Sequence, residues 1–195
     1  MTTEKFYGSH LPFMEAAKGT AILLLQLAAE QADVSSPKIV SRIKKPESME
    51  KKILADKLPV NMQSALQGES DAIGVRMITD SVSNVYKVYE ELIKMQDMQL
   101  VQHNVCFSIL HVKDYIKNPK DSGYRSLHVI AELHSEDPDF STLKVEMQLR
   151  TSIMDCWASL EHLVMYKQVI DLTPEVLDIL DTYRVESERE LAGLK

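Results

Sequence analysis

The sequence predicts an α+β fold in which a mixed sheet of about five strands has helices packed on it. Short β-branched runs alternate with longer segments whose apolar residues recur at helical spacing. The last two extended runs are separated by a short acidic turn, which favours an antiparallel hairpin. Because no repeat, low-complexity segment or linker divides the 195 residues, we expect one domain over residues 1–195 that can bury a sizeable core.

The first third of the chain reads as helix, strand, helix. Residues 11–31 are rich in alanine and leucine and predict a helix that ends near the break at residues 33–37. Residues 38–44 are short and β-branched, which predicts a strand. Pro46 then fits the first turn of a second helix.

The middle of the chain repeats this order. Residues 72–79 predict a buried strand and residues 82–95 a helix with apolar residues at helical spacing. Residues 100–112 are ambiguous but favour a strand, and residues 118–123 have the composition of a loop.

The last third predicts a hairpin followed by helices. Residues 124–133 and 142–150 are the two strands, joined by the acidic turn at residues 134–139. Helices are expected at about residues 152–167 and 174–194.

Polar side chains gather on one face of this hairpin, because alternate residues of a strand share a face. The polar positions are Tyr124, Ser126 and His128 on the first strand and Glu146, Gln148 and Arg150 on the second. A polar face beside an apolar one favours a ligand site. Taken alone, a tyrosine or histidine in a strand is more often a packing residue than a functional one.

Charged residues elsewhere suggest an anion site and a metal site. Arg42 and Lys44 precede a helix start, where unpaired N–H groups favour phosphate, although a solvated basic turn is the better reading of that segment alone. Carboxylates of Asp71 and Glu146 on separate strands would suit one Mg²⁺ if they converge; singly they read as a strand cap and a surface residue.

Two further charged residues have alternative readings. Arg76 lies between apolar neighbours and must be paired, either with phosphate, with Asp71 or in an internal ion pair. Asp155, at the N-terminal side of its helix, either compensates the helix dipole or accepts a hydrogen bond from a base.

Composition narrows the partners and the compartment. A formal charge of −7 argues against a broad nucleic-acid surface, although a local basic patch remains near Arg42. Two cysteines without metal spacing favour a reduced, cytoplasmic setting. The apolar run at residues 21–29 is shorter than the ~20 residues that cross a bilayer, so no membrane span is expected.

Five motifs together carry a family resemblance. They are Asp71-Ala-Ile-Gly-Val-Arg76, Asp114-Tyr-Ile with Pro119-Lys120, Gly123-Tyr-Arg-Ser-Leu-His128, Glu146-Met-Gln-Leu-Arg-Thr151 and Asp155-Cys-Trp-Ala-Ser-Leu-Glu-His162. In order and spacing they resemble the synthetase domain of the RelA/SpoT family. The resemblance covers a core of about residues 38–162 and leaves a flanking helix on each side, at about residues 11–31 and 174–194, as in a small alarmone synthetase.

The resemblance implies a nucleotidyltransferase-like sheet and a specific reaction. The β,γ-pyrophosphate of ATP would pass to the ribose 3′-hydroxyl of GDP or GTP with Mg²⁺, giving AMP and guanosine tetra- or pentaphosphate, (p)ppGpp. Relatives of this kind form tetramers, so a homo-oligomer is expected. The alternatives are a toxin-type relative that pyrophosphorylates tRNA 3′ ends or adenosine nucleotides, for which the net charge disfavours tRNA, and a catalytically silent guanine-nucleotide sensor.

The resemblance also assigns roles to residues by position. Asp71 and Glu146 match metal ligands, and Glu146 also matches the residue that assists the acceptor hydroxyl. The positions matching ATP-binding residues are Arg42, Lys44, Ser48, Lys52 and Arg76, and those matching GTP- or GDP-binding residues are Lys113, Lys120, Tyr124, His128, Gln148 and Asp155. Tyr124 would stack on guanine. The chain departs at Ala55, where relatives have a further arginine that Lys57 would have to replace.

Overall fold

The computed structural model describes residues 2–97 and 106–161 and single residues between 175 and 189. Its strands are β1 (Lys38–Ile43), β2 (Ile73–Thr79), β3 (Phe107–Asp114), β4 (Leu127–His134) and β5 (Thr142–Thr151). Its helices and helical turns are α1 (Thr3–Tyr7), η1 (Gly8–His10), α2 (Leu11–Gln31), α3 (Pro46–Ala55), the π-helical turn η2 (Ser64–Gly68), α4 (Val82–Asp97) and α5 (Ser152–Glu161).

The strands form one mixed sheet in the order β1-β2-β5-β4-β3. β2 and β5 run parallel, and the other neighbours pair antiparallel. β5 is therefore the central strand, with β2 on one side and the β4 partner of its hairpin on the other. The predicted mixed five-stranded sheet is confirmed.

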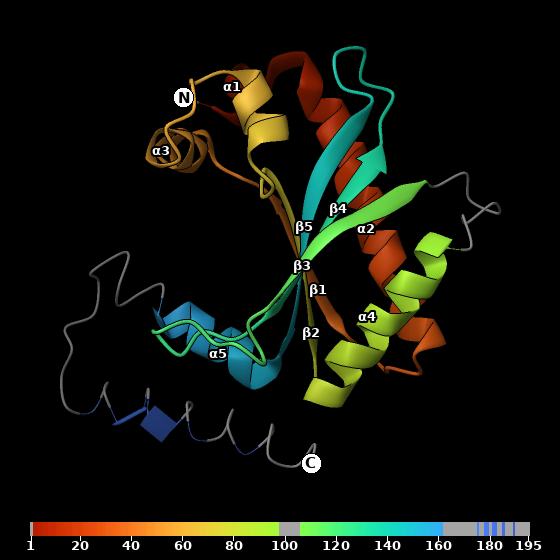
Figure 1. Cartoon of the computed structure of the whole chain (residues 1–195), viewed down its shortest axis with the longest axis vertical. Helices are drawn as coiled ribbons and strands as arrows, with labels where there is room; N and C mark the ends of the chain where they lie inside the picture. Colours follow the sequence, from red (N-terminus) through yellow and green to blue (C-terminus); the bar gives the residue numbers. More distant parts are fainter. Residues whose placement is uncertain are drawn as a thin grey trace.

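Helices α2 and α4 cover one face of the sheet, and α5 lies on the other side (Figure 1). The β5 side chains Val145, Met147 and Leu149 are fully buried and belong to the same hydrophobic core as α2. Burying such side chains contributes roughly 1.5–3 kcal/mol each. The period-two alternation of β5 thus leaves its polar residues on the face away from α2 and α4.

Helix α2 belongs to this core. The helical stretch Thr3–Gln31 is long and apolar enough to cross a membrane by length and composition alone. However, α2 packs against α4 and four of the strands, and residues from Met14 to Ala29 are buried along one side of it. This packing is that of a core helix in a globular protein.

The predicted elements match the structure closely, with one clear error. β4 begins at Leu127 and not at residue 124, because the preceding backbone bonds to a loop: Lys120 N donates to Tyr124 O, and Tyr115 N donates to Ser126 O. α1, η1 and η2 were not expected. The predicted segments at residues 98–105 and beyond 161 lie outside the continuously described residues.

Candidate functional site

The polar side chains of β2, β4 and β5 meet on the sheet face away from α2 and α4. Strand register brings them together, because Gly74 and Arg76 of β2 lie opposite Glu146 and Gln148 of β5. On the other side of β5, His128 of β4 lies opposite Gln148. Residues far apart in sequence therefore line one surface.

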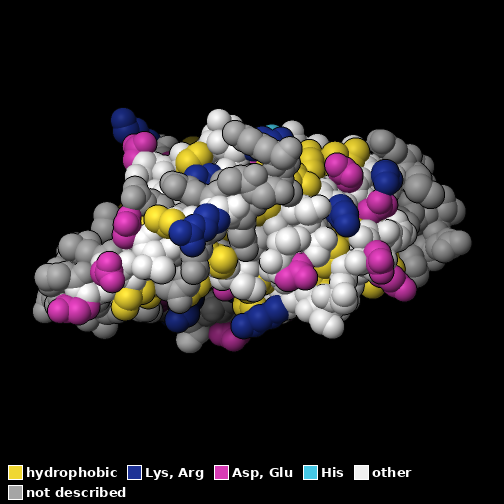
Figure 2. Space-filling view, turned by 90° about the horizontal axis from the view of Figure 1, so that it is seen from below, with side chains coloured by type: hydrophobic (Ala, Val, Ile, Leu, Met, Phe, Trp, Pro, Cys, Tyr) yellow, Lys and Arg dark blue, Asp and Glu magenta, His cyan; other side chains and the backbone are white. Residues whose placement is uncertain are grey.

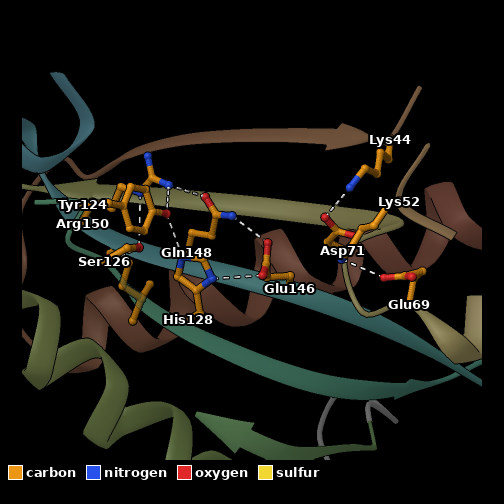
Figure 3. Close-up of polar contacts among 11 residues, drawn as sticks. Lys44, Lys52, Glu69, Asp71, Tyr124, Ser126, His128, Glu146, Gln148 and Arg150 are labelled. Atoms are coloured by element: carbon orange, nitrogen blue, oxygen red, sulfur yellow. Dashed lines mark hydrogen bonds and ion pairs between the residues drawn. The ribbon is translucent and has the colours of Figure 1, made fainter. Parts of the chain in front are cut away.

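The first group on this surface, the Asp71 cluster, consists of Lys44, Lys52, Glu69 and Asp71 (Figure 3). Lys44 Nζ lies 2.5 Å from Asp71 Oδ2, and Lys52 Nζ lies 2.8 Å from Asp71 Oδ1. Lys52 Nζ also contacts Glu69 Oε2 at 2.8 Å. The β1–β2 ladder explains the geometry: Ile43 pairs with Ile73, so the residues just after β1 and just before β2 are neighbours.

These contacts shift the pKa values of the cluster. Partial burial disfavours the charged form of Asp71, but hydrogen bonds from Lys44 and Lys52 outweigh it and hold its pKa below the ordinary value. Burial likewise works against the Lys52 ammonium, yet Asp71 and Glu69 raise its pKa. Asp71 and Lys52 therefore stabilise each other in their charged forms.

The second group, the Glu146 network, consists of Tyr124, His128, Glu146, Gln148 and Arg150. Glu146 Oε1 lies 3.0 Å from His128 Nδ1, and Gln148 Nε2 donates to Glu146 Oε2 at 2.6 Å. His128 Nε2 lies 2.8 Å from the Tyr124 hydroxyl, which accepts a hydrogen bond from Arg150. Arg150 also donates to Gln148 Oε1 at 2.8 Å. A carboxylate accepts only, so His128 donates to Glu146 through Nδ1.

Glu146 stays ionised in this network. Burial opposes its charge, but the hydrogen bond and charge of His128, with Gln148, lower its pKa to about 2. Figure 3 shows Glu146 at the end of the network nearest the Asp71 cluster. The two carboxylates predicted as a metal pair thus lie on the same sheet face.

Arg76 and Arg150 share one carboxylate. Arg76 NH1 lies 2.9 Å from Asp155 Oδ1, and Arg150 NH1 lies 3.3 Å from the same atom. Of the alternatives offered for Arg76, the internal ion pair is formed, and its partner is Asp155. Asp71 is not the partner, because both of its oxygens contact lysines. Asp155 joins α5 to the sheet.

Tyr124 is largely buried, and its ring is not an open surface on which a base could stack. It is 8% exposed, and its ring lies 4.9 Å from Lys120 Nζ and 5.0 Å from the Arg150 guanidinium carbon. Gly123, with φ +82°, lies beneath Trp157, because a Cβ there would come within 3.2 Å of the indole. The missing side chain of Gly123 thus permits the indole to approach the backbone at this position.

The remaining predicted residues lie at the edges of this surface. Arg42 of β1 is exposed, and its stem runs past Gly74. Ser48 is exposed in the first turn of α3, and Lys113 is exposed on β3 opposite His128. Ala55 and Lys57 are both exposed around the C-terminal end of α3.

Sequence reasoning did not single out Glu69 or Tyr7. Glu69 is 4% exposed and contacts the site only through Lys52 among the described residues. Tyr7 is fully buried and donates from its hydroxyl to the Lys44 carbonyl. In the sequence, Glu69 is recognisable only as an acidic residue two positions before Asp71 at the start of a predicted strand. The Tyr7 contact joins residues 37 positions apart, so no local sequence pattern indicates it.

The donor set suits Mg²⁺. Asp71, just before β2, and Glu146, on β5, offer hard carboxylate oxygens, the ligands that Mg²⁺ prefers. Glu69 adds a buried carboxylate oxygen, Oε1, that has no hydrogen-bond partner among the described residues. A separate group, His10 with Asp137 and Asp139, also has metal-ligand spacing, but its closest contact, 2.7 Å from His10 Nδ1 to Asp137 Oδ2, is that of a hydrogen bond.

Comparison with known proteins identifies the family. The sequence pattern of the family described as "Region found in RelA / SpoT proteins" matches residues 41–171. The chain belongs to the RelA/SpoT family.

Individual relatives agree with this assignment. The GTP pyrophosphokinase YwaC of Bacillus subtilis (strain 168) is 36% identical over 141 residues, which are 72% of this chain and 63% of that relative. A structure of a GTP pyrophosphokinase family protein from Streptococcus pneumoniae superposes with a TM-score of 0.76 at 26% identity, covering 97% of this chain and 90% of the other. Small alarmone synthetase 1 from Bacillus subtilis, bound to its product pppGpp, gives 0.69 at 25% identity, covering 97% and 91%.

Proposed function

We propose that the chain is a (p)ppGpp synthetase, a GTP pyrophosphokinase that transfers the β,γ-pyrophosphate of ATP to the 3′-hydroxyl of GDP or GTP. Residues 1–195 would act as one synthetase unit around a core of about 38–162. The observation that carries the proposal is that the Asp71 cluster and the Glu146 network share one sheet face (Figure 3). Family membership and the product-bound relative support the same reaction.

The Asp71 cluster suits the donor nucleotide. Lys44, just before α3, and Lys52, in the last turn of α3, supply ammonium groups that meet at Asp71. Arg42 and Ser48 lie at the exposed edge of the same region, and Arg76 adds a guanidinium on β2. Such cations would offset the repulsion between two polyphosphates that must approach each other.

Asp71 and Glu146 would hold Mg²⁺, whose charge lowers the energy of the developing negative charge during transfer. A pKa of about 2 makes Glu146 a weak proton acceptor. Its ionised state instead favours cation binding and orientation of the acceptor hydroxyl. His128 and Gln148 would fix both of its oxygens in place until substrate arrives.

The Glu146 network and its surroundings suit the guanosine. Lys120 and Lys113 are exposed cations on the rim, and Tyr124 presents its ring beside Lys120. Guanine stacking on Tyr124 would require Lys120 to leave the ring, and this exposed lysine is free to turn toward the nucleotide phosphates. Asp155 would contact the guanine base only after its ion pair with Arg76 or Arg150 breaks. Its main proposed role is therefore to position these two arginines.

Charge and assembly complete the proposal. On the face shown in Figure 2, basic side chains alternate with acidic ones among the described residues, which does not favour a large tRNA surface.

The large apolar residues Leu23, Val40 and Leu54 are exposed and would suit contacts in a homotetramer. Two cysteines without metal spacing favour a reduced compartment, so we expect a cytoplasmic protein.

Product analysis tests the function. Purified protein is incubated with labelled ATP, Mg²⁺ and one acceptor at a time: GDP, GTP, ADP or tRNA. We expect AMP with guanosine tetraphosphate from GDP and pentaphosphate from GTP. Label on tRNA or on an adenosine acceptor alone would indicate the toxin-type activity. Guanine-nucleotide binding without turnover, unchanged in Glu146→Ala, would indicate a silent sensor.

A further inference from the structure

The carboxylate of Asp71 has both oxygens occupied by lysine. Lys44 Nζ lies 2.5 Å from Oδ2, and Lys52 Nζ lies 2.8 Å from Oδ1. A Mg²⁺-sized cation binds the same oxygens at about 2.0–2.1 Å and would repel two ammonium groups at these positions. A divalent cation that binds both oxygens of Asp71 therefore requires both lysines to move off them.

Glu69 makes the two lysines unequal. Its side chain lies beside Lys52, with Oε2 2.8 Å from Nζ, whereas the described contacts of the Lys44 ammonium are to Asp71 alone. When Asp71 turns to a cation, Lys52 keeps a carboxylate partner and Lys44 does not.

The burial of Glu69 is difficult to explain by stability alone. The residue is 4% exposed, and its Oε1 has no hydrogen-bond partner in the part of the chain that the structure describes. A buried carboxylate with one unsatisfied oxygen is costly, and a solvated residue would avoid that cost. A role at the neighbouring site accounts for its position.

We propose that Glu69 is a positioning residue that keeps Lys52 at the site when a divalent cation takes Asp71, so that Lys52 meets the nucleotide phosphates while Lys44 is set free to reach them. The inference rests on the proposed function, because it assigns the cation to Asp71.

The arrangement couples the two ligands. In the nucleotide-free protein the lysines compete with the cation for Asp71, and nucleotide phosphates relieve that competition by accepting the lysines. Each ligand therefore strengthens binding of the other by the same factor. Because Glu69 also binds Lys52, the Lys52 ammonium stays beside the site when it leaves Asp71 and needs only a small movement to reach the phosphates.

Lysine labelling tests the proposal directly. Nucleotide-free protein is treated briefly with acetic anhydride, with and without saturating Mn²⁺, and the acetylation of each lysine is measured by mass spectrometry. In the natural sequence we expect Mn²⁺ to raise the reactivity of Lys44 several-fold and to leave Lys52 protected. In Glu69→Gln, Mn²⁺ should raise the reactivity of both lysines. Lys51, an exposed neighbour on α3, is the internal control and should not respond.

Further variants separate the alternatives. Asp71→Asn should abolish the response to Mn²⁺, and Glu69→Gln should raise KM for ATP more than it lowers kcat. Equal release of Lys44 and Lys52 in the natural sequence, or continued protection of Lys52 in Glu69→Gln, would overturn the role of Glu69, as would labelling that ignores Mn²⁺. A protein that shows the expected pattern but forms no (p)ppGpp would refute the proposed function and leave the role of Glu69 standing.

Discussion

The hydroxyl of Tyr7 donates a 2.9 Å hydrogen bond to the backbone carbonyl of Lys44. Tyr7 is fully buried, with its ring edge-on to Phe6. Burial, and secondly the charge of Asp71, raise the pKa of Tyr7 well above its ordinary value, so the phenol stays protonated and keeps donating. The N-terminal helix α1 therefore supports the Asp71 cluster from behind.

Tyr7→Phe should loosen that support. Losing the hydrogen bond leaves the Lys44 carbonyl without this donor, so the free energy of unfolding should fall by about 1 kcal/mol, and KM for ATP should rise more than kcat falls. Denaturant unfolding and steady-state kinetics measure the two effects. Tyr86→Phe is the matched control: it removes a hydroxyl bonded to Asp114 and should lower stability without changing KM for ATP. An unchanged KM in Tyr7→Phe would contradict the link.

Glu146→Gln should remove the charge that the network maintains while preserving the shape of the side chain. Cation binding and hydroxyl orientation both need the carboxylate, so we expect kcat to fall by about a hundredfold or more with the fold retained. Glu132→Gln, on neighbouring strand β4, controls for loss of one negative charge and should stay active. Activity near the natural level in Glu146→Gln would remove Glu146 from the chemistry.

Gly123→Ala should be destabilising. Its φ of +82° is unfavourable for a residue with a Cβ, and that atom would come within 3.2 Å of Trp157, so the free energy of unfolding should fall by about 1–3 kcal/mol. Because Trp157 is the only tryptophan of the chain, its fluorescence reports the displacement. Gly19→Ala, in helix α2 with nothing within 4 Å of the new Cβ, should instead stabilise by about 0.5–1 kcal/mol. Equal effects of the two substitutions would refute the steric argument.

Asp137→Asn should change stability in a pH-dependent way. Burial opposes the Asp137 charge, but hydrogen bonds from His10 and from the Asp139 backbone lower its pKa below the ordinary value. Stability from a lowered pKa is present above the unfolded-state value, about 3.9, and is lost as pH falls through the folded-state value. The natural protein should therefore exceed the variant by about 1–3 kcal/mol near neutral pH, with the gap closing in acid.

The matched substitution for this comparison is Asp139→Asn. Its carboxylate is 70% exposed and 3.8 Å from the His10 ring, so screening by water should leave only a small effect at any pH. Unfolding free energies from acid to neutral pH provide the measurement. A gap for Asp137→Asn that stays constant or widens in acid would contradict the assignment.

The sheet was predictable because its strands carry distinct local signals. β2 and β5 are apolar at the positions that face α2 and α4, and the acidic turn marked the hairpin of β4 and β5. That Glu146 and Gln148 share the polar face of β5 could be predicted from the alternation of polar and apolar residues alone. The start of β4 was predicted too early. The side chain of Tyr124 fits the alternating pattern of the strand, but its backbone carbonyl accepts a hydrogen bond from Lys120 in the preceding loop.

Pairings between distant segments were less predictable. Whether Arg76 meets Asp71 or Asp155 depends on strand register and on where α5 lies, which no local pattern fixes. Glu69 and Tyr7 were missed for the same reason, because each acts through a lysine whose position is set by β1, β2 and α3 together. Proximity of that kind is a property of the assembled sheet.

The central position of β5 has a consequence for synthesis of the chain. β1 can pair with β2, and β3 with β4, as separate local units, but β5 lies between these two pairs and comes last. Its contact with β2 joins residues about seventy positions apart, and such long-range parallel pairing forms slowly. A ribosome-bound chain that has not yet released β5 therefore has neither a continuous sheet nor Glu146, and the candidate site is complete only when β5 is inserted between β2 and β4.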